Sequence, residues 1–179
     1  MRRALDTFYR LGGALSALHL ALIMILIVAQ VLGRVLDNLL GWAGFEALGL
    51  NVPGLAEIAA FMLLGATFFG LAYTFWQGGH IRVTLALQYL PKPLHRLMDI
   101  AVTLVAASIT GFAAWHSARL ALDSHDYGDL SIGMVPVPLW IPQAVMTLGL
   151  AWLLIALLDA LFLLVSGRIT QLKNEAPQE

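Results

Sequence analysis

The sequence predicts an all-α membrane protein in which four transmembrane helices cross the bilayer, both termini are cytoplasmic, and a short interfacial helix lies between the second and third spans. Hydrophobic residues make up 60% of the 179 residues and charged residues only 12%, about half the charged share of an ordinary soluble domain. Four long runs contain no Asp, Glu, Lys or Arg: Leu11–Gly33, Ile58–Ile81, Ile100–Ala118 and Leu130–Leu158. Each is close to the roughly 20 residues that a helix needs to cross the hydrocarbon core.

These runs are expected to be helices, because a helix satisfies its own backbone hydrogen bonds in lipid. We expect them to form a single four-helix transmembrane domain over residues 1–179. The first run is longer than the roughly 7–15-residue apolar core of a signal peptide, so we interpret it as a retained helix. None of the runs shows the period-two alternation of a membrane barrel strand. The expected spans are Leu11–Leu36, Pro53–Trp76, Leu94–Leu122 and Leu139–Gly167.

Lys and Arg residues predict the orientation, because they are enriched in cytoplasmic loops. Eight of the ten lie on one side of the expected spans, at the N-terminus, between the second and third spans, and at the C-terminus. Only Arg34 and Arg119 flank the other side. We therefore predict that both termini and the Gly78–Arg96 loop are cytoplasmic. The loops Asp37–Val52 and Asp123–Pro138 are then expected to face outward.

Two short apolar segments between the spans are candidates for helices that lie on the membrane surface. Val83–Leu90 is too short to cross, and Pro91 and Pro93 end it before the third span. In the first outward loop, four apolar residues could line one face of a second such helix: Leu40, Trp42, Phe45 and Leu48. Ordinary anchoring of a helix end by tryptophan explains this loop equally well, and both interpretations stay open.

Composition and histidine placement argue against an enzyme or a cofactor protein. The chain has no cysteine, which excludes disulfides and thiolate sites, and it contains no phosphate-loop or nucleophile–base pattern. A haem would need two histidines at similar depth, but His19 and His116 differ in expected depth by about 20 Å. The net charge of −1 gives no reason to expect nucleic acid. We therefore expect no enzymatic activity, no cofactor and no nucleic-acid partner.

Ionisable residues in or beside a span are candidates for function. Glu57, Asp99 and Asp159 lie near span ends, so no line of charges crosses the membrane, and we expect no ion path through this chain alone. We favour an interfacial anchor for Asp159. Arg82 could bind a lipid phosphate or pair with a carboxylate such as Asp99. The candidates for contact with another subunit or with lipid are Glu57, His80, Arg82, Arg96 and Asp99.

A family signature is visible from Gly78 to Ile100, a stretch that reads GGHIRVTLALQYLPKPLHRLMDI. It resembles the small membrane subunit of TRAP transporters, the tripartite ATP-independent periplasmic family. Two further features are similar: an acidic residue opens the second span in LAEIAAF, and a serine precedes a Pro-x-W-like entry to the last span in LSIGMVPVPLWIP. Thr84 departs from the acidic residue found there in many members. The positions that carry the resemblance are Glu57, Gly79, His80, Ile81, Arg82, Ser131, Pro138 and Trp140.

The resemblance implies a role that composition does not show. Such a subunit is a small scaffold in the bacterial inner membrane, beside a large permease subunit that performs sodium-coupled uptake. A periplasmic substrate-binding protein supplies small organic anions such as carboxylates or sugar acids. The implied partners are thus the permease, the binding protein and membrane lipids, and Arg82 could pair with a permease carboxylate. Two alternatives stay open: the small subunit of another tripartite uptake system, and an autonomous four-helix membrane protein such as an electron-transfer subunit.

The segment DSHDYGD, from Asp123 to Asp129, carries three acids and a tyrosine after the third span. A solvated turn is one interpretation. The other is that Asp126, Tyr127 and Asp129 help to dock the binding protein, because exposed charges speed the encounter of two proteins.

Overall fold

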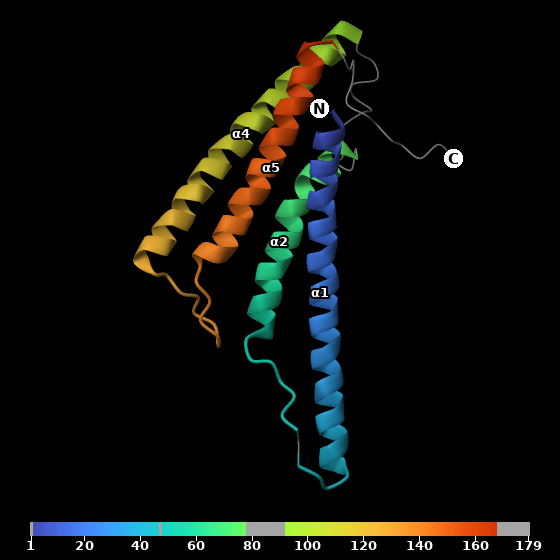
Figure 1. The fold of residues 1–179 in the computed structure, drawn as a ribbon, viewed down its shortest axis with the longest axis vertical. Helices are drawn as coiled ribbons and strands as arrows, with labels where there is room; N and C mark the ends of the chain where they lie inside the picture. The colour runs from blue at the N-terminus through green and yellow to red at the C-terminus, as the bar shows by residue number, and fades with distance from the viewer. Residues whose placement is uncertain (1, 47, 78–91, 168–179) are drawn as a thin grey trace, which may run out of the picture.

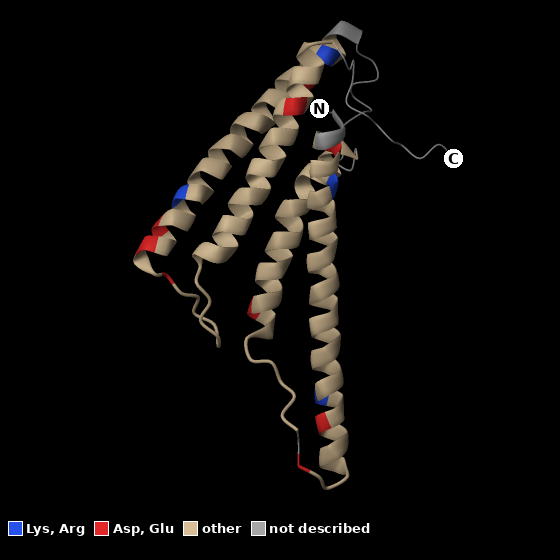
Figure 2. Cartoon of the chain, viewed as in Figure 1, with Lys and Arg blue, Asp and Glu red and all other residues tan. Residues whose placement is uncertain are grey.

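The structure is a computed structural model that describes residues 2–46, 48–77 and 92–167. Each of its four long helices is apolar enough to cross a membrane, as predicted, and long stretches of every helix carry no Lys, Arg, Asp or Glu (Figure 2). The expected Val83–Leu90 helix lies outside the described residues. The helices are α1 (Arg2–Trp42), α2 (Leu55–Trp76), α4 (Lys92–Tyr127) and α5 (Trp140–Val165).

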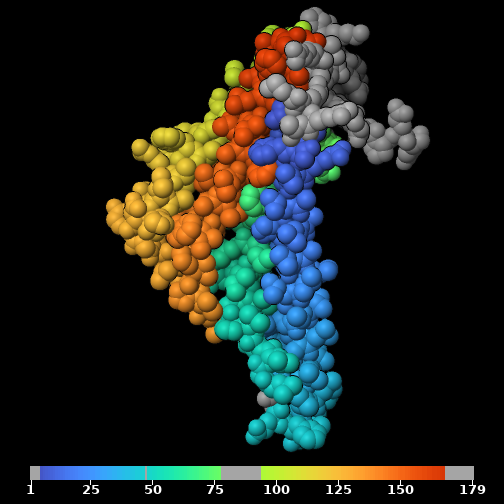
Figure 3. Space-filling view, viewed as in Figure 1, coloured from blue at the N-terminus to red at the C-terminus, as the bar shows by residue number. Residues whose placement is uncertain are grey.

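The helices form an open layer in the order α4, α5, α2, α1 (Figure 1). α4 packs on α5, α5 on α2 and α2 on α1, whereas the contact between α1 and α5 is small. The chain therefore begins at one edge of the layer, with α1, and reaches the other edge with α4 before α5 returns to the middle. The edge formed by α1 extends well beyond the other helices (Figure 3).

α1 is the longest helix and exceeds the expected span. Its 41 residues correspond to about 60 Å, twice the roughly 30 Å hydrocarbon core. The expected span Leu11–Leu36 lies inside it, but the helix continues through Leu40 and Trp42, because this leucine-rich stretch favours helix. Phe45 and Leu48 follow in a non-helical segment. Of the two interpretations left open for this loop, the described residues therefore do not support a separate interfacial helix.

A strap of non-helical chain, residues 48–54, runs back along α1 and leads into α2. The backbone N–H groups of alternate residues of the strap point toward α1, as expected of extended chain. The side chains of α1 thus satisfy backbone donors that have no helix or sheet partner. Three N–H groups of the strap donate to α1: those of Leu48 and Leu50 to the two carboxylate oxygens of Asp37, at 2.9 and 3.2 Å, and that of Val52 to the amide oxygen of Gln30, at 3.0 Å.

Gly33 lets the strap approach α1 closely. It lies between Gln30 and Asp37 on the same face of the helix, given their spacing of three and four residues. A Cβ at Gly33 would lie 2.7 Å from the carbonyl oxygen of Leu50, so any larger residue would displace the backbone of the strap. The side-chain amide N–H of Gln30 also donates a hydrogen bond to the amide oxygen of Asn51. Three residues of α1 therefore build the seat of the strap.

An aromatic cluster ties the N-terminal end of α1 to α2 and α5. It consists of Phe8 and Tyr9 from α1, Trp76 from α2 and Trp152 from α5. Phe8 stacks on Trp152 with ring centroids 4.2 Å apart, and Tyr9 stacks on Trp76 at 5.7 Å. The indole N–H of Trp152 also donates to the carbonyl of Phe8, at 3.2 Å. Buried aromatic surface therefore fixes this end of α1.

The interface between α4 and α5 is built from small hydroxyl side chains. A seven-residue repeat keeps one face of a helix against its neighbour, and small residues let helix backbones approach closely in lipid. The hydroxyl of Ser117 lies 2.7 Å from that of Thr147 on α5. Four buried residues of α4 follow one another at intervals of seven: Thr103, Thr110, Ser117 and Ser124.

The connection from α4 to α5 is a short hairpin, residues 129–139. Leu130 and Pro138 form an antiparallel bridge. The N–H of Ser131 donates to the carbonyl of Val137 at 2.9 Å, and the N–H of Val137 donates to the Ser131 hydroxyl oxygen at 3.0 Å. Ser131 therefore closes the hairpin with both its backbone and its side chain.

Candidate functional site

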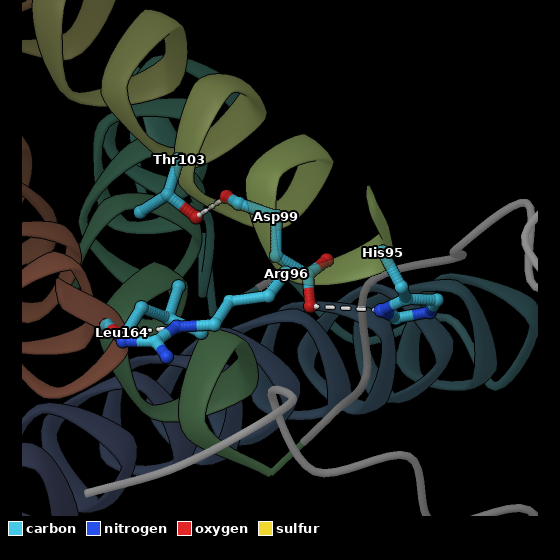
Figure 4. Close-up of polar contacts among 5 residues, drawn as sticks. All are labelled: His95, Arg96, Asp99, Thr103 and Leu164. Atoms are coloured by element: carbon cyan, nitrogen blue, oxygen red, sulfur yellow. Dashed lines mark hydrogen bonds and ion pairs between the residues drawn. The ribbon is translucent and has the colours of Figure 1, made fainter. Parts of the chain in front are cut away.

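Arg96, near the start of α4, holds the C-terminal end of α5 (Figure 4). Its Nη2 donates to the carbonyls of Leu164 and Val165 at 2.7 and 3.1 Å, and its Nε donates to Leu164 at 3.1 Å. The last carbonyls of a helix have no intrahelical partner and carry partial negative charge, so a guanidinium suits this position. Arg96 was a candidate for contact with another subunit or with lipid, and the structure gives it a partner within the chain.

Asp99 lies one turn after His95 on the buried side of α4 (Figure 4). It is 4% exposed, and its Oδ2 is 3.5 Å from Nδ1 of His95. The hydroxyl of Thr103 donates to the backbone carbonyl of Asp99 at 2.7 Å. The carboxylate is thus enclosed beside an imidazole that can donate to it when Nδ1 carries a proton. Outside the described residues lie Arg82 and the rest of its motif: Gly79, His80 and Ile81.

Asp159 and the histidines of α1 and α4 lie at separate places in the layer. Asp159 accepts a hydrogen bond from the hydroxyl of Tyr9 at 3.3 Å, which joins α5 to the aromatic cluster. Nδ1 of His19 lies 2.8 Å from the carbonyl oxygen one turn earlier in α1. His116 is on α4, at the opposite edge of the layer from α1. Within the described residues, no group of three or more His, Asp or Glu side chains could hold a metal ion.

Glu57 lies in the first turn of α2 and faces the hairpin. Its Oε2 is buried and has no hydrogen-bond partner among the described residues. The hairpin backbone at Gly133 comes so close that a Cβ there would overlap the carboxylate. Val135 of the same hairpin packs against Gly54, just before α2. The tip of the hairpin and the start of α2 therefore fit together around one carboxylate group.

A pocket of about 610 Å³ opens beside Glu57, between α1, α2, the strap and the hairpin. Its polar residues come from three of these elements: Gln30 and Arg34 from α1, Asn51 from the strap and Glu57 from α2. The remaining lining is mostly apolar. The lining therefore carries one positive side chain, from α1, and one negative side chain, from α2, and is otherwise mostly apolar.

The family-like positions near the last helix have structural roles in the hairpin. Ser131 and Pro138 close it through the bonds described above. Trp140 begins α5, and its ring centroid is 5.5 Å from that of His125 at the end of α4. These three residues therefore set the geometry with which α4 turns into α5.

The three candidate docking residues lie where α4 ends. Tyr127 is 82% exposed, and Asp126 is exposed beside His125, with Oδ1 and Nδ1 3.7 Å apart. Asp129 has an exposed side chain, while its backbone is held by Ser124 and Leu139 at 3.0 Å each. The structure thus presents all three side chains on one exposed turn.

Sequence reasoning missed the seat of the strap and the hairpin glycine that meets Glu57. A signal for the seat was present, since Gln30 and Asp37 are polar residues seven apart at the end of an apolar run, which places them on one helix face. The sequence around Gly133 carries no such signal, because Gly133 and Glu57 are far apart in the chain and come together only in the folded structure.

Comparison with known proteins agrees with the resemblance read from the sequence. The family model for the DctQ component of tripartite ATP-independent periplasmic transporters matches residues 23–167, which include α2, α4, α5, the hairpin and about half of α1. The ectoine TRAP transporter small permease protein TeaB of Halomonas elongata is 26% identical over 157 residues, covering 86% of this chain and 78% of the relative. The protein is thus a multi-pass membrane component of a transporter and not an enzyme. The chain belongs to the DctQ component family of tripartite ATP-independent periplasmic transporters.

Proposed function

We propose that this small permease subunit is a scaffold beside a large permease subunit, which forms the transport path. The open layer of helices carries this proposal. Because α1 and α4 lie at opposite edges, the described helices do not close around a path. The Asp, Glu, Lys and Arg residues of the described helices also lie toward helix ends, so no line of these charged groups crosses the described part of the chain.

The proposed partners are the large permease subunit, a periplasmic substrate-binding protein and membrane lipids, in the bacterial inner membrane. Both termini are cytoplasmic in this proposal, because eight of the ten Lys and Arg residues lie on that side. The Val83–Leu90 segment is an interfacial helix on the same side, and the whole chain is one domain. His80, Arg82 and Asp99 are proposed contacts with the permease or with lipid headgroups at this face.

The proposed transport is sodium-coupled uptake of small organic solutes. Carboxylates and sugar acids are the classes that the sequence resemblance implies. The relative TeaB is named for ectoine, so ectoine joins them as a candidate substrate.

Reconstitution tests the scaffold role directly. Proteoliposomes would contain the large permease subunit, this chain, or both, with binding protein and labelled solute outside and a sodium gradient directed inward. Uptake is expected only when both membrane subunits and the loaded binding protein are present. Removing this chain should reduce uptake to background, whereas uptake by this chain alone would contradict the proposal.

We also propose that the exposed turn at the end of α4 docks the binding protein. Its exposed acids, Asp126 and Asp129, can steer a transient partner without contributing much to final affinity. The double change Asp126→Lys and Asp129→Lys should raise the half-saturating concentration of binding protein and leave maximal uptake nearly unchanged. The effect should shrink with salt, because exposed charges are screened over about 8–10 Å at physiological ionic strength.

Glu46→Lys is the matched control for this experiment. Glu46 is also exposed and lies in the other outward loop, so its reversal changes the net charge without touching the turn. If Glu46→Lys shifts the half-saturating concentration as much as the double change does, the effect is one of overall charge. Wild-type dependence in the double variant at low salt would show that the turn is only a connector.

A further inference from the structure

The pocket beside Glu57 has the size and lining of a ligand site. Its volume of about 610 Å³ falls within the roughly 300–1,000 Å³ of small-molecule sites. Its apolar surface comes from both helices and from the tip of the hairpin: Ile27, Ala56, Ala59, Ile132 and Met134. All these elements belong to, or connect, helices that are long and apolar enough to cross a membrane, so lipids are among the molecules that can reach the pocket.

Glu57 gives the pocket a negative wall. One oxygen of its carboxylate, Oε2, is buried without a hydrogen-bond partner among the described residues. A carboxylate with a buried, unbonded oxygen is costly in apolar surroundings. A cation that reaches the pocket therefore gains from contact with this group.

Arg34, on α1, adds a positively charged residue to the lining of the pocket. The described residues offer it no hydrogen bond or ion pair, and its side chain is exposed toward the pocket opening. Leu55 and Ala56, the first residues of α2, also line the pocket, and their backbone N–H groups lie at the start of the helix. Such groups have no intrahelical partner and attract anions such as phosphate. Arg34 and the start of α2 thus form an anion subsite next to the carboxylate.

We propose that this pocket binds a zwitterionic phospholipid, with the phosphate at Arg34 and the first N–H groups of α2, the ammonium group at Glu57, and an acyl chain along Ile27 and Ala59. The juxtaposition of opposite charges selects the occupant. An anionic phospholipid without an ammonium group could place its phosphate at Arg34 but would leave the carboxylate of Glu57 without a counter-charge. Phosphatidylethanolamine is therefore preferred over phosphatidylglycerol at this site.

Native mass spectrometry of the full-length protein tests the proposal. The protein, purified in detergent, would be incubated with equal amounts of phosphatidylethanolamine and phosphatidylglycerol. Wild-type protein is expected to retain more phosphatidylethanolamine, by roughly fivefold if the ammonium contact is worth about 1 kcal/mol. Glu57→Gln should remove this preference. Arg34→Gln should lower retention of both lipids. Glu46→Gln and Arg119→Gln, which change charges outside the pocket, should behave as wild type.

A steric variant keeps the proposal testable if a charge variant folds poorly. Ala59→Leu fills the apolar part of the pocket from α2 and should reduce retention of both lipids, while helical content by circular dichroism stays unchanged. Equal retention of the two lipids by wild-type protein would overturn the proposal. The proposal would also be overturned if none of the three pocket variants changed either the amount of lipid retained or the preference between the two lipids. In that case the pocket would be covered by protein or solvent instead of lipid.

Discussion

The two ends of α1 are held to the rest of the molecule in opposite ways. At its N-terminal end, Tyr9 is 3% exposed and packs among aromatic rings from α2 and α5. Toward its other end, Leu32 is 63% exposed, and among the described residues the helix is held to the strap by hydrogen bonds to Gln30 and Asp37. One end therefore depends on close packing and the other on a few hydrogen bonds. In lipid this difference matters, because apolar surface alone gives helices no reason to associate.

The largest effect is expected at the packed end. Tyr9→Ala removes a buried ring and its hydrogen bond to Asp159, so it should lower the free energy of unfolding by roughly 2–4 kcal/mol. Circular dichroism during denaturant titration in detergent would measure the loss. Leu32→Ala on the exposed part of the same helix should change it by no more than about 0.5 kcal/mol. Similar losses for the two variants would contradict the contrast between the ends.

An intermediate effect is expected where the strap meets α1. Gly33→Ala places a Cβ against the Leu50 carbonyl, and the resulting strain should cost about 1–3 kcal/mol. Gly41→Ala is the control, because a Cβ there meets nothing within 4 Å, and alanine favours helix over glycine by up to about 1 kcal/mol. A cysteine at position 50, in a chain without native cysteine, should react faster with a thiol reagent in the Gly33→Ala background. Equal labelling rates in both backgrounds would show that the strap does not depend on this close approach.

The smallest effect is expected at the carboxylate that holds the strap. Asp37→Asn leaves one acceptor oxygen for the N–H groups of Leu48 and Leu50, so the strap should be weakened by about 1 kcal/mol. Amide hydrogen exchange at these two residues should then be roughly fivefold faster. Asp123→Asn, an exposed acid on α4, should leave their exchange unchanged. Exchange that is also unchanged in Asp37→Asn would mean that other contacts hold the strap.

The four membrane-length helices of the described residues and the approximate bounds of α2 could be predicted from the sequence, because long charge-free runs dictate helix in lipid. The end of α1 could not. Asp37 was predicted to begin a loop, yet it is a helical residue whose carboxylate accepts hydrogen bonds from backbone N–H groups eleven and thirteen residues away. A charged residue at the end of an apolar run usually indicates exposure to solvent, whereas the carboxylate of Asp37 makes a tertiary contact.

The candidate site was predictable only in part, for a similar reason. Glu57 was identified from its place at the start of the second span, and the structure puts it in the first turn of α2. Its neighbour Gly133 is 76 residues later in the chain, a separation at which no local pattern signals contact. Arg96 was identified as a candidate as well, but its carbonyl partners on α5 follow from the order in which the helices pack.

The length of α1 has a consequence for the surrounding bilayer. Exposed apolar side chains continue along it from Leu11 to Leu39, a distance on the order of 40 Å, whereas the 22 residues of the adjacent α2 cover only about 33 Å. Two helices that lie side by side therefore have unequal hydrophobic lengths. A tilt that fits α1 into a hydrocarbon layer of about 30 Å leaves α2 too short, so the lipid along this edge must be deformed in thickness. This hydrophobic mismatch makes the α1 edge the part of the protein whose stability should respond most to acyl-chain length.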